Sequence, residues 1–159
     1  MIDLQGKVAV VTGSGQGLGL SAAQALAKAG AAVVVNDIDA DRAQAAVDSI
    51  VAAGGRATAQ VVAIGSSEAA DQCVERAVSA FGRLDIMVTN AGILRDKVLW
   101  NMSDDDFDRV IETHLRGTFT CARAAVRHFR SQNEGGRLIL VSSLAGQKGN
   151  FGQGNYSAA

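Results

Sequence analysis

The chain contains, near its N-terminus, the stretch Val8-Ala9-Val10-Val11-Thr12-Gly13-Ser14-Gly15-Gln16-Gly17-Leu18-Gly19. Four apolar residues before a turn fit a buried strand, and an alanine-rich helical pattern follows the turn. The four glycines let the backbone approach a large polyanion closely, and the amides at the start of the next helix suit a pyrophosphate. We therefore predict a dinucleotide-binding loop; the alternative is a glycine-rich loop that only turns a corner.

Length and composition predict one α/β domain over residues 1–159, with 48% hydrophobic residues and 18 glycines for close packing of helices on a sheet. The net charge of −1 does not indicate a nucleic-acid partner or an anionic membrane. The sequence has no apolar run long enough to span a membrane, and residues 1–7 do not resemble a secretory signal, so we predict a cytoplasmic location. Cys73 and Cys121 lie in apolar helical patterns and are predicted to be reduced core residues, neither a disulfide nor metal ligands.

Strand patterns alternate with helix patterns along the whole chain. The predicted strands cover residues 7–12, 31–36, 58–64, 84–89 and 137–142, and the longest predicted helix runs from residue 104 to about 130. Residues 143–155 are predicted to be a loop, and residues 156–159 the first turn of a further helix. Right-handed crossovers then give a Rossmann-like, doubly wound parallel sheet with the strand order 3-2-1-4-5. The loops after strands one, four and five should meet at the carboxyl edge, where such sheets bind ligands.

Polar residues mark the helix starts. Asp39 or Asp41 is expected to cap the second helix, Ser66 or Ser67 the third, and Ser103 the long one. In the long helix, apolar residues at three- and four-residue spacing form one stripe: Phe107, Val110, Ile111, Leu115, Ala122, Ala125, Val126 and Phe129. This stripe either covers the sheet or pairs with a second copy of the chain.

Asp37 stands at the end of the second predicted strand, eighteen residues after Gly19. A carboxylate there accepts hydrogen bonds from the adenosine ribose hydroxyls and repels a 2′-phosphate. Residues 14–16 are neutral and offer the phosphate no cation, so the sequence favours NAD over NADP. Ile38 is placed to pack on the adenine. The alternatives are that Asp37 is only a turn residue, or that Asp39 takes the ribose, although Asp39 lies past the strand end.

The spacing of the loop narrows the interpretation to a family. The pattern T-G-x-x-x-G-x-G fits at Thr12, Gly13, Gly17 and Gly19, whereas G-x-G-x-x-G does not fit in its usual register. Residues 90–92, Asn-Ala-Gly, follow the fourth strand; a serine ends the fifth strand, and a tyrosine comes thirteen residues later. Together these features resemble the short-chain dehydrogenase/reductase family.

This resemblance implies roles for individual residues. Ser143 matches the family's serine that hydrogen-bonds the substrate oxygen, and the neighbouring Ser142 has the wrong spacing to the tyrosine. Tyr156 matches the acid/base that exchanges a proton with that oxygen; a phenol needs cationic neighbours to act as a base. The implied cofactor contacts are Thr12, Gly13, Ser14, Gln16, Gly17, Leu18, Gly19, Asp37, Ile38, Ile64, Asn90, Ala91, Gly92 and Tyr156.

The chain departs from the family at three places. The family's lysine, four residues after the tyrosine, falls one position beyond Ala159, and the later strands and substrate lid are also missing. We therefore expect a C-terminally incomplete domain that is inactive by itself. His114 stands where most relatives have an asparagine that holds a water of the proton relay; it either binds that water or is a polar residue at a helix kink. Ile64-Gly65 replaces the acid that holds the adenine amino group.

Three segments resemble one group within the family. Residues 90–96, 114–119 and 149–156 are similar to the (3R)-hydroxyacyl-CoA dehydrogenase module of multifunctional enzyme type 2, with the 3-oxoacyl-[acyl-carrier-protein] reductases close behind. The resemblance implies hydride transfer between NAD and C3 of a 3-hydroxyacyl or 3-oxoacyl thioester, in a homodimer or homotetramer. The alternatives are a dehydrogenase for another secondary alcohol, such as a steroid or sugar, and a dinucleotide-binding module without catalysis.

Overall fold

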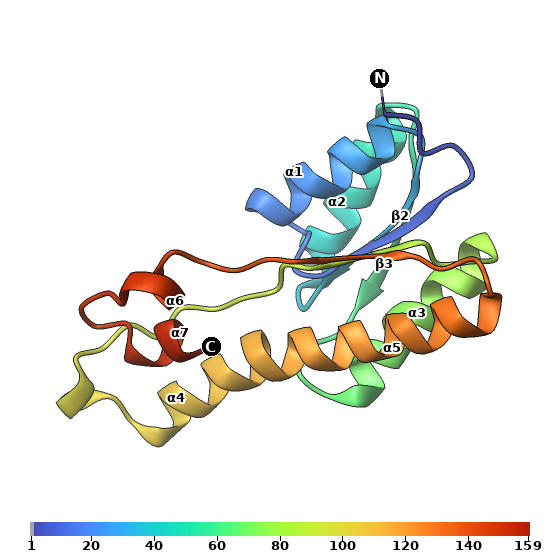
Figure 1. Ribbon diagram of the computed structural model, residues 1–159. Helices are drawn as coiled ribbons and strands as arrows, with labels where there is room; N and C mark the ends of the chain where they lie inside the picture. Colours follow the sequence, from blue (N-terminus) through green and yellow to red (C-terminus); the bar gives the residue numbers. More distant parts are fainter. Residues whose placement is uncertain (1) are drawn as a thin grey trace.

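The computed structural model describes residues 2–159, which form a five-stranded sheet with helices on both faces (Figure 1). The strands are β1 (Val8–Val11), β2 (Ala32–Asp37), β3 (Arg56–Val61), β4 (Ile86–Thr89) and β5 (Arg137–Leu140). All neighbouring strands are parallel, and their order is β3-β2-β1-β4-β5. The predicted doubly wound sheet and its strand order are therefore confirmed.

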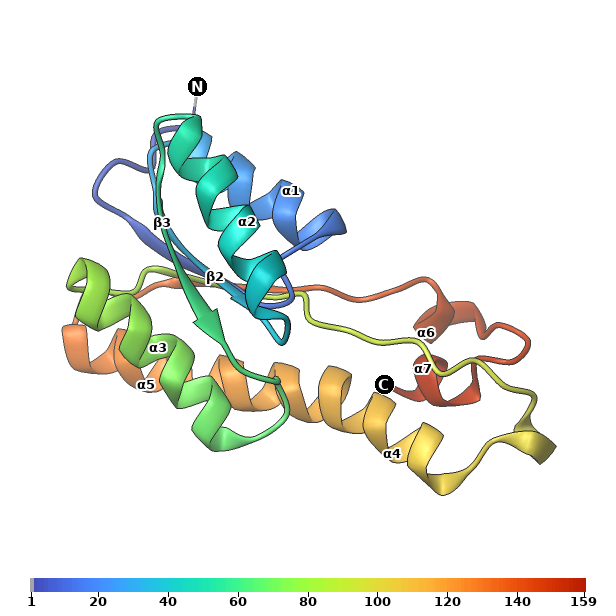
Figure 2. The ribbon, with the colours of Figure 1, turned by 180° about the vertical axis from the view of Figure 1, so that it is seen from behind.

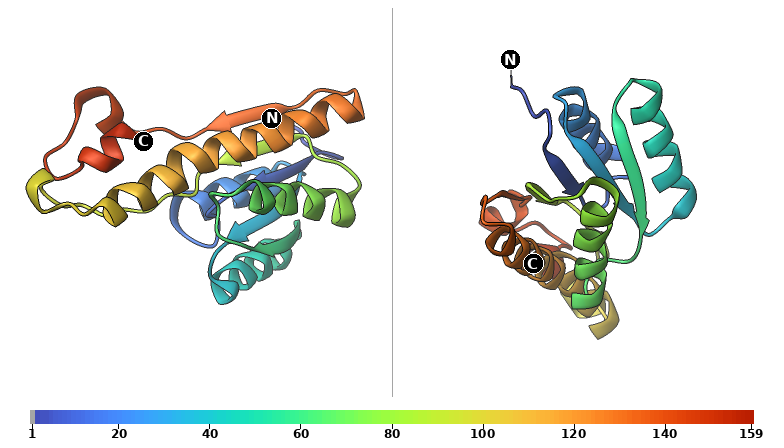
Figure 3. Two further views of the ribbon diagram at one scale, coloured as in Figure 1. Left: turned by 90° about the horizontal axis from the view of Figure 1, so that it is seen from below. Right: turned by 90° about the vertical axis from the view of Figure 1, so that its right-hand side faces the viewer.

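Helices cover both faces of the sheet and extend past one end of it (Figure 2). They are α1 (Gly17–Lys28), α2 (Ala40–Ala52), α3 (Ser67–Phe81), α4 (Asp104–Ile111), α5 (Gly117–Gln132), α6 (Ala145–Lys148) and α7 (Gly154–Ala158). Helices α1 and α2 pack on one face, and α3 and α5 pack on the other (Figure 3). Helices α4, α6 and α7 lie together beyond the end of the sheet (Figure 1).

The central strands are buried on both faces because their side chains alternate between two cores. Val8, Val10 and Val34 pack with α3 and α5. Val11 and Val35 pack with α1 and α2 on the opposite face. Near-continuous valine runs are what this double burial requires, and they are the signal that predicted the strands.

The strand boundaries differ from the predictions by one to three residues, and the largest difference is at β3. Strand β3 spans Arg56–Val61 rather than residues 58–64, because its ladder with β2 pairs Ala32 with Arg56 and Asp37 with Val61. Strand β5 ends at Leu140, two residues earlier than predicted. Residues 138–141 are exposed, so β5 is an open apolar edge of the sheet in the described chain.

The predicted single helix over residues 104–130 is interrupted. A π-helical segment, Glu112–Arg116, joins α4 to α5, and the three form one long rod (Figure 1). The wider turn changes which residues share a face. Phe107, Leu115 and Val126, predicted in the same apolar stripe, are exposed, whereas Val110 and Phe129 are buried.

The helix caps settle the alternatives left by the sequence. The Asp39 side chain caps α2, rather than Asp41. The Ser66 hydroxyl caps α3, rather than Ser67. Ser103 begins α4 with a full capping box, as predicted.

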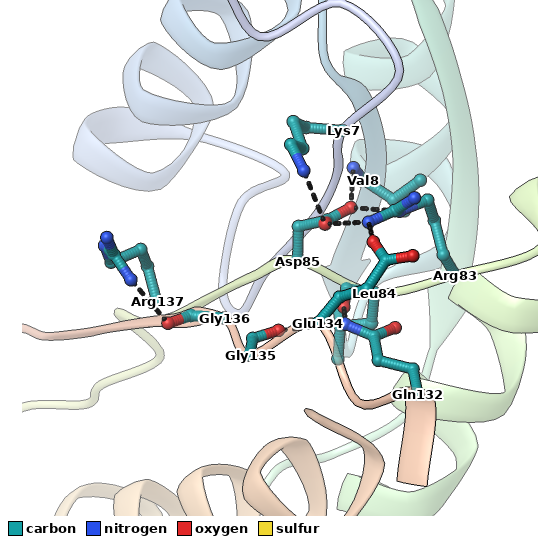
Figure 4. Close-up of polar contacts among 10 residues, drawn as sticks. All are labelled: Lys7, Val8, Arg83, Leu84, Asp85, Gln132, Glu134, Gly135, Gly136 and Arg137. Atoms are coloured by element: carbon teal, nitrogen blue, oxygen red, sulfur yellow. Dashed lines mark hydrogen bonds and ion pairs between the residues drawn. The ribbon is translucent and has the colours of Figure 1, made fainter. Parts of the chain in front are cut away.

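Asp85 ties the amino ends of the central strands together, at the edge of the sheet away from the glycine loop (Figure 4). Its carboxylate accepts hydrogen bonds from the Val8 amide at 2.9 Å, the Lys7 ammonium at 3.3 Å and the Arg83 guanidinium at 2.6 and 2.8 Å. Arg83 also pairs with Glu134. Burial opposes ionisation of Asp85, but these donors outweigh it and hold the pKa of the carboxyl below its usual range.

Cys73 and Cys121 are free and buried, in α3 and α5. Burial raises the pKa of Cys73 to about 12 and that of Cys121 to about 11, so both remain thiols. Within residues 2–159, no helix is long and apolar enough to cross a membrane, and no cluster of three or more His, Cys, Asp or Glu is placed to hold a metal ion.

Candidate active site

A cavity of about 780 Å³ opens at the carboxyl ends of β1, β2, β4 and β5. It is lined by all but two of the residues predicted as cofactor or catalytic contacts: Gly13, Gln16, Gly17, Leu18, Gly19, Asp37, Ile38, Ile64, Asn90, Ala91, Gly92, His114, Ser143 and Tyr156. Ser142 lines it as well. Residues at or after the ends of all five strands therefore meet at one hollow, as the sheet topology requires.

The glycines of the loop are demanded by close backbone contacts. A Cβ on Gly19 would lie 2.2 Å from the Gly13 carbonyl oxygen, and a Cβ on Gly15 would lie 2.6 Å from Asp37 Oδ2. Gly13 has φ +61°, and a Cβ there would lie 2.8 Å from the Cα of Ala91. Side chains at these positions would push the loops after β1, β2 and β4 apart.

Gly17, the first residue of α1, is different. It has φ +59°, but a Cβ built there meets no atom within 4 Å. The space beside this helix N-terminus is open and forms part of the cavity. Helix α1 has 12 residues and no acidic residue in its first turn, so its free amides and its dipole favour an anionic group at this point.

Thr12 and Ser14 were predicted as cofactor contacts, but neither residue lines the cavity. The Ser14 hydroxyl is fully buried and donates to the Val11 carbonyl at 2.6 Å. The buried Thr12 hydroxyl accepts hydrogen bonds from the amides of Asn90 and Ala91, both at 3.0 Å. Both hydroxyls therefore shape the loop from behind, through hydrogen bonds to backbone groups.

Asn90 joins the glycine loop to the loop after β4. Its amide nitrogen Nδ2 donates to the carbonyls of Thr12 and Gly13, both at 3.0 Å. The same Nδ2 atom lies 2.6 Å from the position that a Cβ on Gly19 would take. The glycine loop and the Asn-Ala-Gly segment are thus one unit, and changes in either displace both.

Asp37 is 92% buried at the cavity wall, and its two carboxylate oxygens each accept a backbone hydrogen bond. Oδ2 accepts from the Gly15 amide at 3.0 Å, and Oδ1 accepts from the Asp39 amide at 3.1 Å. These bonds fix the carboxylate beside the glycine loop, where the ribose of a dinucleotide was predicted. Ile38, next to it, is 71% exposed and available as an apolar surface.

His114 lies at an irregularity of the helix, which is one of the two alternatives that the sequence left open, and its part in a proton relay stays a prediction. It lies in the π-helical segment, and its Nε2 is 2.9 Å from both the amide nitrogen and the carbonyl oxygen of Ile93. A Cβ on Gly92 would lie 2.4 Å from the imidazole, so this glycine admits the ring. The ring also packs edge-on against Tyr156, with centroids 5.1 Å apart.

Ser143 and Tyr156 reach the cavity from the segment after β5. The predicted loop over residues 143–155 contains the short helix α6, and the Ser143 hydroxyl accepts the Ala145 amide at its start. Tyr156 lies in α7, where its amide donates to Asn155 Oδ1 at 2.8 Å. Both side chains are half-buried, so each presents a polar group to the hollow.

Three functional residues were not predicted from the sequence. Asn36 holds the loop after β3 through hydrogen bonds to Gln60 and Val62 carbonyls. The fully buried Asn155 donates to the carbonyls of two other segments. Arg42 lines the cavity from the first turn of α2. Only Arg42 carried a sequence signal, since it lies in the first turn of the helix that follows Asp37.

The residues present fit a dinucleotide. The open space at Gly17 and the amides of α1 suit the pyrophosphate. Asp37 suits ribose hydroxyls, and Ile38 and Ile64 provide apolar surface for the adenine. His114, Ser143 and Tyr156 stand at the opposite side of the same cavity, where a reactive end would lie beside acid/base groups.

Comparisons with known proteins agree with this geometry. The family model described as short chain dehydrogenase matches residues 7–159. Peroxisomal multifunctional enzyme type 2 of Mus musculus is 45% identical, over 97% of this chain and 22% of that protein. Hydroxyacyl-CoA dehydrogenase ChsB1 of Mycobacterium tuberculosis is 48% identical, over 99% of this chain and 53% of that protein. The 3-oxoacyl-[acyl-carrier-protein] reductase of Synechocystis is 41% identical, over 100% of this chain and 64% of that protein.

Solved structures give the same picture. A short chain dehydrogenase from Mycobacterium avium matches with a TM-score of 0.92 and 44% identity, over 98% of this chain and 58% of that one. A short-chain type dehydrogenase/reductase from Mycobacterium marinum matches with a TM-score of 0.95 and 31% identity, over 99% and 64%. The chain thus spans less than two thirds of each of these relatives.

Proposed function

Because this chain belongs to the short-chain dehydrogenase family, we propose that it supplies the cofactor site and acid/base groups of an oxidoreductase that acts on a 3-hydroxyacyl or 3-oxoacyl thioester. The observation that carries the proposal is the shared cavity: the open end of α1, Asp37, Ser143 and Tyr156 all line it. An anion site, a ribose site and two hydroxyl groups within one hollow fit hydride transfer at an alcohol or ketone.

In the proposed reaction, Tyr156 exchanges a proton with the substrate oxygen. For oxidation, the phenolate takes the hydroxyl proton, the C3–H bond breaks and the C3=O double bond forms. The Ser143 hydroxyl hydrogen-bonds that oxygen and holds it in place. His114 packs against the Tyr156 ring and fixes its orientation. A nicotinamide cofactor held by the glycine loop and Asp37 would supply the hydride acceptor in this direction and the hydride donor in reduction.

The proposed cofactor is NAD. Asp37 is fixed by the Gly15 and Asp39 amides and faces the cavity with a negative charge. Such a carboxylate accepts hydrogen bonds from a ribose diol and repels a 2′-phosphate. Neither Gln16 nor Ser14 offers a positive charge in the loop.

The acyl thioester is proposed from the relatives. The names of three similar proteins include hydroxyacyl-CoA dehydrogenase, multifunctional enzyme type 2 and 3-oxoacyl-[acyl-carrier-protein] reductase. Two of these names state an acyl thioester, one with a hydroxyl group and one with a 3-oxo group. A small-molecule substrate of this class also fits a hollow that is walled by apolar as well as polar residues.

The test is turnover by the full-length protein with NAD and a 3-hydroxyacyl-CoA, beside a steroid and a sugar alcohol as competing substrates. We expect NADH formation with the thioester and at least about tenfold lower kcat/KM with the other two, since each missing contact costs a factor of this order. Absence of turnover with the thioester, together with ample activity on the sugar or steroid, would overturn the substrate class.

We further propose a cytoplasmic location and assembly into a homodimer or homotetramer. Assembly is supported by the outer face of the rod formed by α4, the π-helical segment and α5. Phe107, Leu115, Phe119 and Val126 are exposed along it. The rod carries acids in α4 and arginines in α5, so an antiparallel copy would bring opposite charges together.

A further inference from the structure

A cation stands at the ribose end of the cavity, although the glycine loop has none. Arg42, in the first turn of α2, lines the cavity together with Asp37. A Cβ on Gly15 would lie 2.9 Å from the Arg42 Cβ and 2.6 Å from Asp37 Oδ2. The two charged residues therefore flank the same point of the loop, where the ribose of a bound dinucleotide would approach.

The Arg42 guanidinium is paired with Asp39 rather than left free. Its Nε lies 3.5 Å from Asp39 Oδ2, and the Arg42 side chain is 52% exposed. The other Asp39 oxygen, Oδ1, accepts the Arg42 amide at 3.1 Å and caps the helix. One carboxylate thus holds both the backbone and the side chain of Arg42. Half-exposed pairs of this kind are weak and rearrange when a stronger anion arrives.

A guanidinium is a good phosphate ligand, because its planar donors match two phosphate oxygens at once. We propose that Arg42 is a latent ligand for a 2′-phosphate on the adenosine ribose, and that Asp39 suppresses it by pairing with it. This inference rests on the proposed dinucleotide site. Selectivity for NAD over NADP then depends on two carboxylates: Asp37 repels the phosphate, and Asp39 neutralises the cation that would bind it.

The experiment measures dissociation constants of NADH and NADPH by fluorescence titration of the full-length protein. In Asp39→Asn, the side chain still caps α2, because asparagine caps as well as aspartate, but the charge on Arg42 is released. We expect the ratio of the NADPH to the NADH dissociation constant to fall about fivefold. In Asp39→Asn/Arg42→Gln, this gain should disappear.

Asp41→Asn is the matched control. Asp41 is exposed in the same helical turn and forms no ion pair within residues 2–159, so its replacement removes the same charge without releasing Arg42. An equal gain in Asp41→Asn, a gain that survives Arg42→Gln, or an unchanged ratio in Asp39→Asn would each overturn the inference. Failure of the wild type to bind NADH would instead overturn the dinucleotide site itself.

Discussion

Gly19 is the residue at which the fold and the site depend on each other most directly. Its position is set by the Gly13 carbonyl on one side and the Asn90 amide on the other, which leave no room for a Cβ. The spacing of glycines in the sequence identified this position correctly. Of the two groups that exclude a Cβ, the Gly13 carbonyl belongs to the same loop, whereas Asn90 lies in the loop after β4 and carries no local signal.

The first prediction concerns Gly19→Ala. The added methyl group would overlap backbone atoms that cannot move without separating the two loops, so we expect a loss of at least about 3 kcal/mol in the free energy of unfolding and no NADH binding. Gly54→Ala is the control: Gly54 has φ +84° but open space around it, and we expect only about 1–2 kcal/mol of backbone strain. Urea unfolding and NADH titration measure both variants; equal losses in the two would contradict the steric explanation.

His114 and Ser14 show what residue patterns leave undetermined. The sequence placed His114 either at a helix kink or in the proton relay, and the structure has it in a π-helical segment with its ring on Tyr156. Ser14 was predicted to face the cofactor and is buried behind the loop. A motif names positions, but the direction of each side chain depends on which buried backbone groups need a partner.

Helix α7 depends on one buried side chain. Asn155 Nδ2 donates to the carbonyls of Arg95 and Asp106, both at 3.0 Å, and its Oδ1 accepts the Tyr156 amide. The side chain therefore joins α7 to α4 and to the loop after β4. These contacts bridge more than forty residues, which is why no local pattern predicted them.

The second prediction follows for Asn155→Ala. Two carbonyls, that of Asp106 buried and that of Arg95 partly buried, would lose their donor. We expect the free energy of unfolding to fall by about 2–4 kcal/mol, with a larger loss of protection from hydrogen exchange in α7 than in α1. Asn150→Ala removes one exposed side-chain hydrogen bond from the same segment and should cost less than about 0.5 kcal/mol. Urea unfolding and hydrogen exchange provide the measurements, and similar effects of the two substitutions would contradict the bridging role.

The third prediction concerns Asp85, at the amino ends of the central strands, and how the stability of the fold depends on pH. Asp85 has a lowered pKa in the folded chain, so its ionised form stabilises the fold above its ordinary pKa of about 3.9, and this stabilisation is lost as the pH falls through the lower folded value. Asp85→Asn should reduce the free energy of unfolding by about 1–3 kcal/mol at pH 7. This loss is smaller than the loss expected on breaking a fully buried ion pair, because the side chains of Lys7 and Glu134 are exposed to solvent. The difference between variant and wild type should shrink below about pH 4. Unfolding curves at both pH values test this; a constant difference would contradict it.

The strand order of the whole sheet was predictable, because it follows from general rules on how parallel strands and helices are connected. Alternation of apolar strands and helices, with right-handed crossovers, gave the order 3-2-1-4-5 and the loops that meet at the cavity. The π-helical segment was not predicted from spacing, because the apolar residues on either side of it keep a helical pattern; only the alternative of a helix kink at His114 pointed to it. The position of Arg42 was not predictable from the glycine loop, because the loop itself contains no cation and the fold brings this one from α2.

The fourth prediction concerns assembly of the full-length protein. Burial of the rod's exposed apolar residues against a second copy should give dimers or tetramers in analytical ultracentrifugation. Phe119→Glu and Val126→Glu together would place charges within that interface and should yield monomers. Val51→Glu, an exposed valine on α2, is the control and should leave assembly unchanged. Monomers in the wild type, or dissociation caused by the α2 control, would contradict the interface.

The central claim is that the cavity is a dinucleotide-linked active site in which Tyr156 handles the proton, and Tyr156→Phe tests it most directly. This substitution removes one oxygen atom and keeps the ring that packs against His114. In the full-length protein with NAD and a 3-hydroxyacyl-CoA, we predict that kcat falls by at least about a thousandfold while the dissociation constant of NADH changes by less than about threefold. Near wild-type turnover in Tyr156→Phe would contradict the account.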